Sequence, residues 1–215
     1  MPSYSIGVYM GLISGSGSIT RYQVEGALPA NFMEEYPLRI SRYAFKNFDE
    51  NSLEERSIGW VNIMDIFDSR FAAMEYLKEP FIAMTLRVDE RKVPQTALRQ
   101  YCLEAEEKVK ELEKLEFLPK STRQEIKEHG RIQLLKRSIP VTRTYDMLWN
   151  TTSGVVIFGG VNNKVGDEFC ELFLKTFDLQ LSPLFPYAIA AKALEKDGVS
   201  SDVLDGLIPF HASRG

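Results

Sequence analysis

The strongest constraint on the fold is a pair of strand-like segments joined by a short polar turn. Residues 142–149 and 155–158 are rich in β-branched and aromatic side chains, and Thr-Thr-Ser-Gly at 151–154 separates them. Such segments pair as an antiparallel β-hairpin. Helix-like segments lie on both sides of this hairpin along the chain. The sequence therefore predicts an α+β fold with a mixed, largely antiparallel sheet packed with helices.

Hydrophobic periodicity extends this prediction to the rest of the chain. Alternating or β-rich segments predict further strands at residues 19–25, 57–63, 80–88 and 179–184. Helical spacing predicts helices at residues 30–46, 162–177 and 187–196. Together these elements predict one α+β core.

The chain is expected to have four parts. The core is formed by residues 19–93 and 141–197, and residues 94–140 form a separate helical arm. Residues 1–18, which are rich in Gly and Ser, are expected to be a flexible N-terminus, and residues 198–215 a loose tail.

The arm is predicted from two amphipathic segments. Pro94 suits the first turn of a helix. Pro119 is expected to end this first helix, and Ser121 to cap a second one that runs to about Ser138. Two long helices joined by a short loop predict an antiparallel hairpin that protrudes from the core. In the first helix, apolar side chains recur at spacings of three and four residues, at Leu98, Cys102, Ala105, Val109 and Leu112.

Composition excludes several classes of protein. At 215 residues with 44% hydrophobic content, the chain can bury a core without disulfides or metals. Its two cysteines, Cys102 and Cys170, have no spacing motif and are expected to be buried free thiols in a reducing compartment. The sequence shows neither an apolar segment long enough to span a bilayer nor a signal peptide. We expect a cytoplasmic protein without a cofactor.

Positive charge is concentrated in one part of the chain although the net charge is −4. Residues 120–143 hold seven basic side chains against two acidic ones, which leaves −9 on the remainder. Three of the basic residues recur every four positions and so share one face of the second arm helix. Such a row can follow a phosphate backbone, although a charged face often serves only to keep a protein soluble. The candidate DNA-binding residues are Lys120, Arg123, Lys127, Arg131, Lys136, Arg137 and Arg143.

The sequence indicates no catalytic constellation. His129 and His211 lie far apart and lack partners at zinc-ligand spacing, so no metal site is expected. A two-metal nuclease would need several carboxylates in one pocket, and its candidates are the acids near strand ends, Asp65, Asp68, Asp89 and Glu90. We expect these acids to be solvated. The aromatic residues of the strands are expected to pack in the core rather than stack on bases: Trp60, Tyr145, Trp149 and Phe158.

Several segments resemble one known family. The hairpin Met147-Leu-Trp-Asn-Thr-Thr-Ser-Gly-Val-Val-Ile-Phe, followed by a helix from Asn163-Lys-Val to Leu174-Lys-Thr-Phe, resembles RdgC, the recombination-associated DNA-binding proteins. Ile58-Gly-Trp-Val, Val93-Pro94 and Leu134-Leu-Lys-Arg-Ser-Ile-Pro are similar to other family segments in the same order. The resemblance covers about residues 10 to 185.

The resemblance implies a head-to-head homodimer that closes into a ring around duplex DNA and limits the activity of RecA filaments. Lys120, Arg123, Lys127 and Arg137 fall where the family also has basic residues, and Arg131 falls where an apolar residue can stand. Ile139 stands where the best-known members have an aromatic residue.

The expected function is therefore sequence-independent DNA binding in recombination, in the cytoplasm and associated with the nucleoid. Double-stranded DNA is the main expected partner, with single-stranded DNA also considered. Two alternatives stay open. One is a metal-dependent exonuclease, and the other is a protein-interaction module that dimerises through the helical arm.

Overall fold

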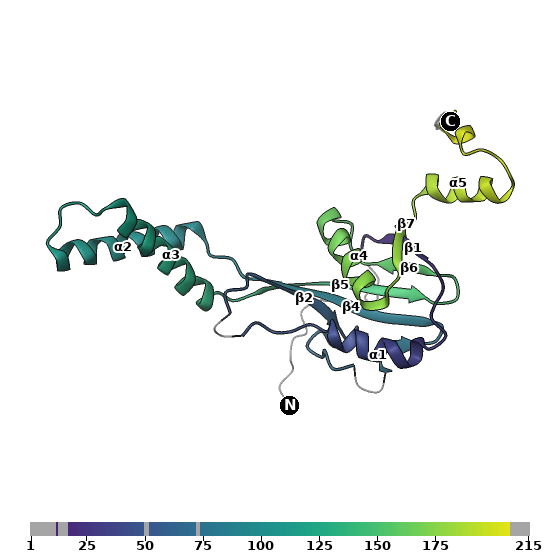
Figure 1. Cartoon of the computed structure of the whole chain (residues 1–215), viewed down its shortest axis with the longest axis horizontal. Coiled ribbons are helices and arrows are strands. Elements are labelled where there is room, and N and C mark those ends of the chain that lie inside the picture. Colours follow the sequence, from purple (N-terminus) through teal and green to yellow (C-terminus); the bar gives the residue numbers. More distant parts are fainter. Residues whose placement is uncertain (1–11, 13–16, 50–51, 72–73, 207–215) are drawn as a thin grey trace, which may run out of the picture. The chain divides into compact units, whose positions relative to one another are not determined.

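The computed structural model describes residues 12, 17–49, 52–71 and 74–206 (Figure 1). The flexible N-terminus predicted for residues 1–18 lies almost wholly outside the described residues, as do the last nine residues of the predicted tail. Among the described residues, no helix combines the length and the apolar character that crossing a membrane requires.

The strands form one sheet in the order β2-β4-β5-β6-β1-β7, with β3 also paired to β4. Their bounds are β1 Thr20–Glu25, β2 Arg56–Val61, β3 Leu77–Lys78, β4 Phe81–Glu90, β5 Val141–Asn150, β6 Val155–Phe158 and β7 Gln180–Pro183. Strand β1 pairs antiparallel with β6 and β7, β4 with β2 and β3, and β5 with β6, and one isolated parallel bridge joins Ala44 to Trp60. With six helices among the described residues, the predicted α+β class is confirmed.

The chain divides into two compact units. The first lies within residues 1–42, 71–84 and 145–215, and the second comprises residues 43–70 and 85–144. Because the division falls inside β4 and β5, each of these strands contributes residues to both units.

An aromatic cluster forms the core of the first unit. Helices α1 (Phe32–Arg42) and α4 (Asn163–Phe177) pack against the face of the sheet that carries Trp149. The Trp149 ring lies 5.2 Å from the rings of both Phe173 and Phe177 on α4. Tyr36 of α1 joins them, with its ring 5.0 Å from that of Phe177. All four rings are almost completely buried, so they supply much of the hydrophobic stabilisation of this unit.

The remaining helices of the first unit follow β7. They are α5 (Pro186–Lys196) and α6 (Asp202–Asp205), which contact each other. The short helix α6 lies in the segment predicted to be a loose tail.

Buried charges organise the second unit around the end of β4. Arg87 and Asp89 project from the same face of the strand, and both oxygens of the Asp89 carboxylate accept hydrogen bonds from Arg87, at 2.9 and 2.7 Å. The Arg87 guanidinium also lies 4.2 Å from the centre of the Phe45 ring. Arg91, just beyond the strand, donates through its side chain to the carbonyl oxygens of Ser52 and Glu54. These contacts bind the irregular segments on either side of β2 to β4.

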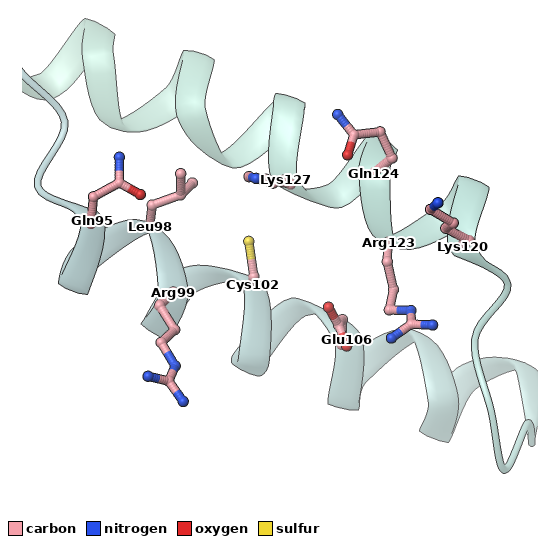
Figure 2. A pocket seen from close by; sticks show the side chains of 9 residues that line it. All are labelled: Gln95, Leu98, Arg99, Cys102, Glu106, Lys120, Arg123, Gln124 and Lys127. Atoms are coloured by element: carbon pink, nitrogen blue, oxygen red, sulfur yellow. The ribbon is translucent and has the colours of Figure 1, made fainter.

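The second unit also holds the two long helices, α2 (Gln95–Glu113) and α3 (Lys120–Arg137), which pack against each other. They run antiparallel, as Figure 2 shows. They approach closely at Gly130, where an added Cβ would lie 2.5 Å from a ring carbon of Tyr101. A mid-helix Gly is unfavourable by about 1 kcal/mol relative to Ala, so its presence here indicates that the close contact matters more. The two predicted helices are therefore present and pack against each other, although their capping differs from the prediction.

Both ends of the predicted loop between these helices are corrected by the structure. Helix α2 ends at Glu113, before Pro119, because Lys114 adopts a left-handed conformation with φ 54° and donates to the carbonyl oxygen of Lys110. Helix α3 begins at Lys120 with Pro119 as its N-cap, and Ser121 is not the cap. Leu118, which directly precedes Pro119, is buried, so the loop is anchored next to the start of α3.

Gly59 allows a close crossing of two chain segments in the second unit. Tyr43 and Phe45 exchange backbone hydrogen bonds with Trp60, at 3.0 and 2.8 Å. A Cβ added at Gly59 would lie 2.5 Å from the Cα of Phe45 and 2.6 Å from its backbone nitrogen. Because both of these are backbone atoms, a rotamer change cannot relieve the clash.

We therefore expect Gly59→Ala to lower the free energy of unfolding by about 1–3 kcal/mol, the usual range for overpacking. Chemical denaturation measures this change. Gly17→Ala is the matched control, because an added Cβ there meets nothing within 4 Å. Equal stability of the two variants would contradict the close crossing.

Candidate nucleic-acid interface

A groove runs between α2 and α3 and has a volume of about 480 Å³. We call it the α2–α3 groove. Leu98 and Cys102 project from α2 toward α3, Arg123 extends from α3 toward α2, and the Arg99 side chain points away from α3 (Figure 2). The lining residues are Gln95, Leu98, Arg99, Cys102, Glu106, Lys120, Arg123, Gln124 and Lys127.

The lining of this groove is strongly basic. Arg99, Lys120, Arg123 and Lys127 face a single carboxylate, that of Glu106. All four basic side chains are exposed, and within the described part of the chain none of them forms an ion pair. Unpaired cations on two facing helices create a local positive field on a protein whose net charge is negative.

A second groove, of about 400 Å³, adjoins the first and shares Gln95, Leu98 and Lys127 with it. We call it the Glu55 groove. Its remaining lining residues are Glu55, Lys92, Val93 and Arg131. Arg131 contacts the Glu55 carboxylate at 2.5 Å, and about half of each side chain is exposed. Three cations therefore surround one carboxylate in this groove.

The structure separates the seven predicted DNA-binding residues into groups, although all seven are exposed. Three line the α2–α3 groove (Lys120, Arg123 and Lys127), and Arg131 lines the Glu55 groove. Lys136 and Arg137 lie in the last turn of α3 and line neither groove. Ile139 follows them with 87% of its surface exposed.

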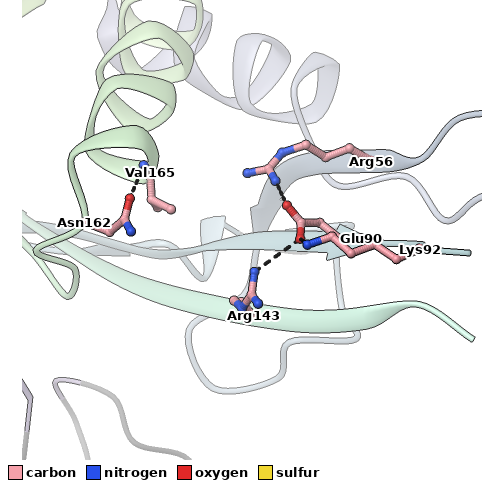
Figure 3. Close-up of polar contacts among 6 residues, drawn as sticks. All are labelled: Arg56, Glu90, Lys92, Arg143, Asn162 and Val165. Carbon is pink, nitrogen blue, oxygen red and sulfur yellow. Dashed lines mark hydrogen bonds and ion pairs between the residues drawn. The ribbon is translucent and has the colours of Figure 1, made fainter. Parts of the chain in front are cut away.

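Arg143 belongs to a separate ion-pair cluster centred on Glu90 (Figure 3). Its guanidinium lies 3.3 Å from the Glu90 carboxylate, and the Lys92 ammonium lies 3.1 Å from it. Arg56, which pairs with Glu90 across β2 and β4, is the third partner. Arg143 is thus engaged by a protein carboxylate.

Two basic residues of the grooves were missed by the sequence analysis. Lys92 precedes α2, and Arg99 lies in the second turn of that helix. The charge count was confined to residues 120–143 and did not include them. The sequence did contain a signal for these two residues. Lys92 and Arg99 precede the acidic part of α2, which begins at Glu104, so the start of this helix is locally basic.

The family model described as "Putative exonuclease, RdgC" matches residues 20–195, which is most of the chain. The chain belongs to the RdgC family. This family is associated with recombination, which implies a DNA-related function. A comparison with curated proteins finds no match.

The RdgC description raises the question of a nuclease metal centre. Asp89 is buried rather than solvated as expected and is paired with Arg87, and Glu90 is paired with three basic partners. Asp65 accepts the backbone N–H of Phe67, and Asp68 accepts two hydrogen bonds from Arg70, which lower the pKa of its carboxyl group. The part of the chain that the structure describes contains no group of three ligating side chains that could hold a metal ion. These four acids do not fit a metal site.

The strand aromatics of this RdgC-family chain belong mainly to the core, as predicted. Trp60, Trp149 and Phe158 are completely buried. Tyr145 is half-buried and stacks on Phe158, with ring centres 5.8 Å apart. Neither groove is lined by an aromatic residue, so these grooves offer no platform on which bases could stack.

We expect Asp89→Asn to lower the free energy of unfolding by about 3–5 kcal/mol, because it leaves the buried Arg87 guanidinium without its charged partner. Denaturant titration measures the loss. Asp65→Asn is the control, since an Asn oxygen can still accept the Phe67 N–H. A stable Asp89→Asn protein would show that this carboxylate is not needed for folding and would reopen a chemical role.

Proposed function

We propose that this RdgC-family protein binds DNA through the phosphate backbone, without reading base sequence, along the α2–α3 groove and the adjoining Glu55 groove. The observation that carries the proposal is the set of cations on both walls of the α2–α3 groove, which have no ion-pair partner among the described residues and share the groove with one carboxylate. Lys and Arg neutralise phosphates and release their counterions, and such contacts carry no sequence information.

The spacing of the cations supports this mode of binding. Lys120, Arg123 and Lys127 are three and four residues apart on α3, and Arg131 follows after four more. At 1.5 Å per residue the row extends over about 16 Å along the helix. One DNA strand carries a phosphate about every 3.4 Å along the duplex axis, so the row is long enough to contact several phosphates. Arg99 and Lys92 add charge from the side of α2.

We further propose that the bound protein limits recombination by occupying DNA that a RecA-type recombinase would otherwise coat. Membership in a recombination-associated family supports this role. We propose that the protein acts as a homodimer that encircles or coats duplex DNA and is associated with the nucleoid. Two linked binding faces raise the effective affinity, so such a dimer would stay bound to DNA for longer. Lys136, Arg137 and Arg143 would then extend the basic face beyond the grooves.

The affinity for duplex DNA should fall steeply as salt concentration rises and should differ little between unrelated sequences. With four to six phosphate contacts, the slope of log K against log salt is about −4 to −5. Fluorescence anisotropy over a salt series measures both quantities. Salt-independent binding would contradict the proposal, and a stable dimer that fails to bind DNA would favour the protein-interaction module.

Reversing two groove cations should weaken binding strongly. We expect Arg123→Glu with Lys127→Glu to reduce affinity at least tenfold and to make the salt slope shallower by about 2, because two phosphate contacts are lost. Lys108→Glu with Lys114→Glu is the matched control, since both lysines are exposed and line neither groove. An equal loss in the control would mean that only the total charge matters.

An exonuclease is the second candidate, because the description of the matching family names one. It differs from a binding protein in a direct way, since it shortens linear DNA when a divalent metal ion is present. Incubation of the purified protein with end-labelled duplex and Mg²⁺ or Mn²⁺ separates the two. Progressive loss of terminal nucleotides that scales with protein concentration would establish the nuclease.

A further inference from the structure

Arg131 differs from Lys120, Arg123 and Lys127 because it is paired with a protein carboxylate. Its guanidinium donates to the Glu55 carboxylate at 2.5 Å, whereas Lys120, Arg123 and Lys127 have no such partner among the described residues. The two partners are 76 positions apart in sequence, and both belong to the second unit. This contact therefore depends on the fold and is not a local pairing within a helix.

The backbone that carries Glu55 is fixed on both sides. The Glu55 carbonyl oxygen accepts the backbone N–H of Arg91 at 2.8 Å, and the Arg91 side chain donates to the carbonyl oxygens of Glu54 and Ser52. The next residue, Arg56, begins β2 and pairs with Glu90. The Glu55 carboxylate is thus presented to α3 from an anchored position.

The surroundings of Glu55 have the character of an anion site. Lys92, Lys127 and Arg131 line the same groove, and Glu55 supplies its single negative charge. A carboxylate and a phosphate use the same guanidinium donors, so each can replace the other on an arginine. Because about half of both side chains is exposed, water and ions screen the pair, and little free energy is needed to separate it.

We propose that Glu55 takes the place of a DNA phosphate on Arg131 in the free protein and is displaced when DNA binds. The inference rests on the proposed DNA-binding function and adds a built-in competitor to it. A ligand that contacts only Arg131 gains little binding free energy, because it merely replaces Glu55 there. A polyanion also contacts other groove cations, and those contacts offset the free energy of separating Glu55 from Arg131. Glu55 thereby favours extended nucleic-acid backbones over isolated anions.

The test compares two neutralising substitutions of equal charge. Glu55→Gln removes the competitor and should tighten duplex binding about two- to fivefold more than Glu125→Gln does. Glu125 is an exposed acid of α3 that lines neither groove, so its substitution measures the general effect of one lost negative charge. Anisotropy titrations at one fixed salt concentration give both affinities.

The same two substitutions are then made in an Arg131→Ala background. There the extra gain from Glu55→Gln should disappear and fall to the level of Glu125→Gln, because the site for which Glu55 competes is gone. Thermal unfolding verifies that each variant is folded, and Glu55→Ala serves as a second variant if Glu55→Gln is not.

The outcomes separate the two proposals. If the wild-type protein does not bind duplex DNA even at low salt, the proposed function fails. If it binds but Glu55→Gln and Glu125→Gln have equal affinities, only the competitor is overturned. A gain from Glu55→Gln that persists unchanged in the Arg131→Ala background also overturns it, because Glu55 would then act by general repulsion.

Discussion

The buried charges at the end of β4 are the constraint on which the second unit depends. A guanidinium that leaves water is costly unless its donors are satisfied, so Arg87 and Arg91 require defined partners. Arg87 finds them in Asp89, in the Ile66 carbonyl oxygen and in the faces of Phe45 and Phe67. Arg91 finds them in residues 52–54 and the Phe48 ring. Segments with little secondary structure of their own are thereby held in one conformation next to the start of α2.

Much of the fold could be predicted because periodicity reports which side chains are buried. The hairpin of β5 and β6 and the helices α2 and α3 lie within a few residues of the predicted ranges. The ends of α2 and α3 were less predictable. A left-handed Lys114 has no signature in the sequence, since Gly or Asn is the usual residue in that conformation. Ser121 satisfied the rule for an N-cap, but the helix begins one residue earlier, at Lys120, directly after the buried Leu118 and Pro119.

The candidate site was less predictable than the fold because charge acts through space. Counting along residues 120–143 found the cations of α3 but not Lys92 and Arg99, which come from the chain before and within α2. It also could not show that Arg131 and Arg143 have carboxylate partners, which lie 76 and 53 positions away. The sequence thus identified a basic helix, but only the tertiary structure shows which of its cations are paired with carboxylates.

The contact between Gly130 and Tyr101 has a consequence for how this surface can change during evolution. The aromatic ring occupies the space that any other side chain on α3 would need, so the distance between the two helices is tied to this one pair. Surface cations along the helices can be exchanged one at a time without disturbing that distance. A change at Gly130 would instead move all the cations of one wall relative to the other. Selection can therefore change the positive charge of this surface one residue at a time. The spacing between α2 and α3 can change only together with the contact of Gly130 and Tyr101.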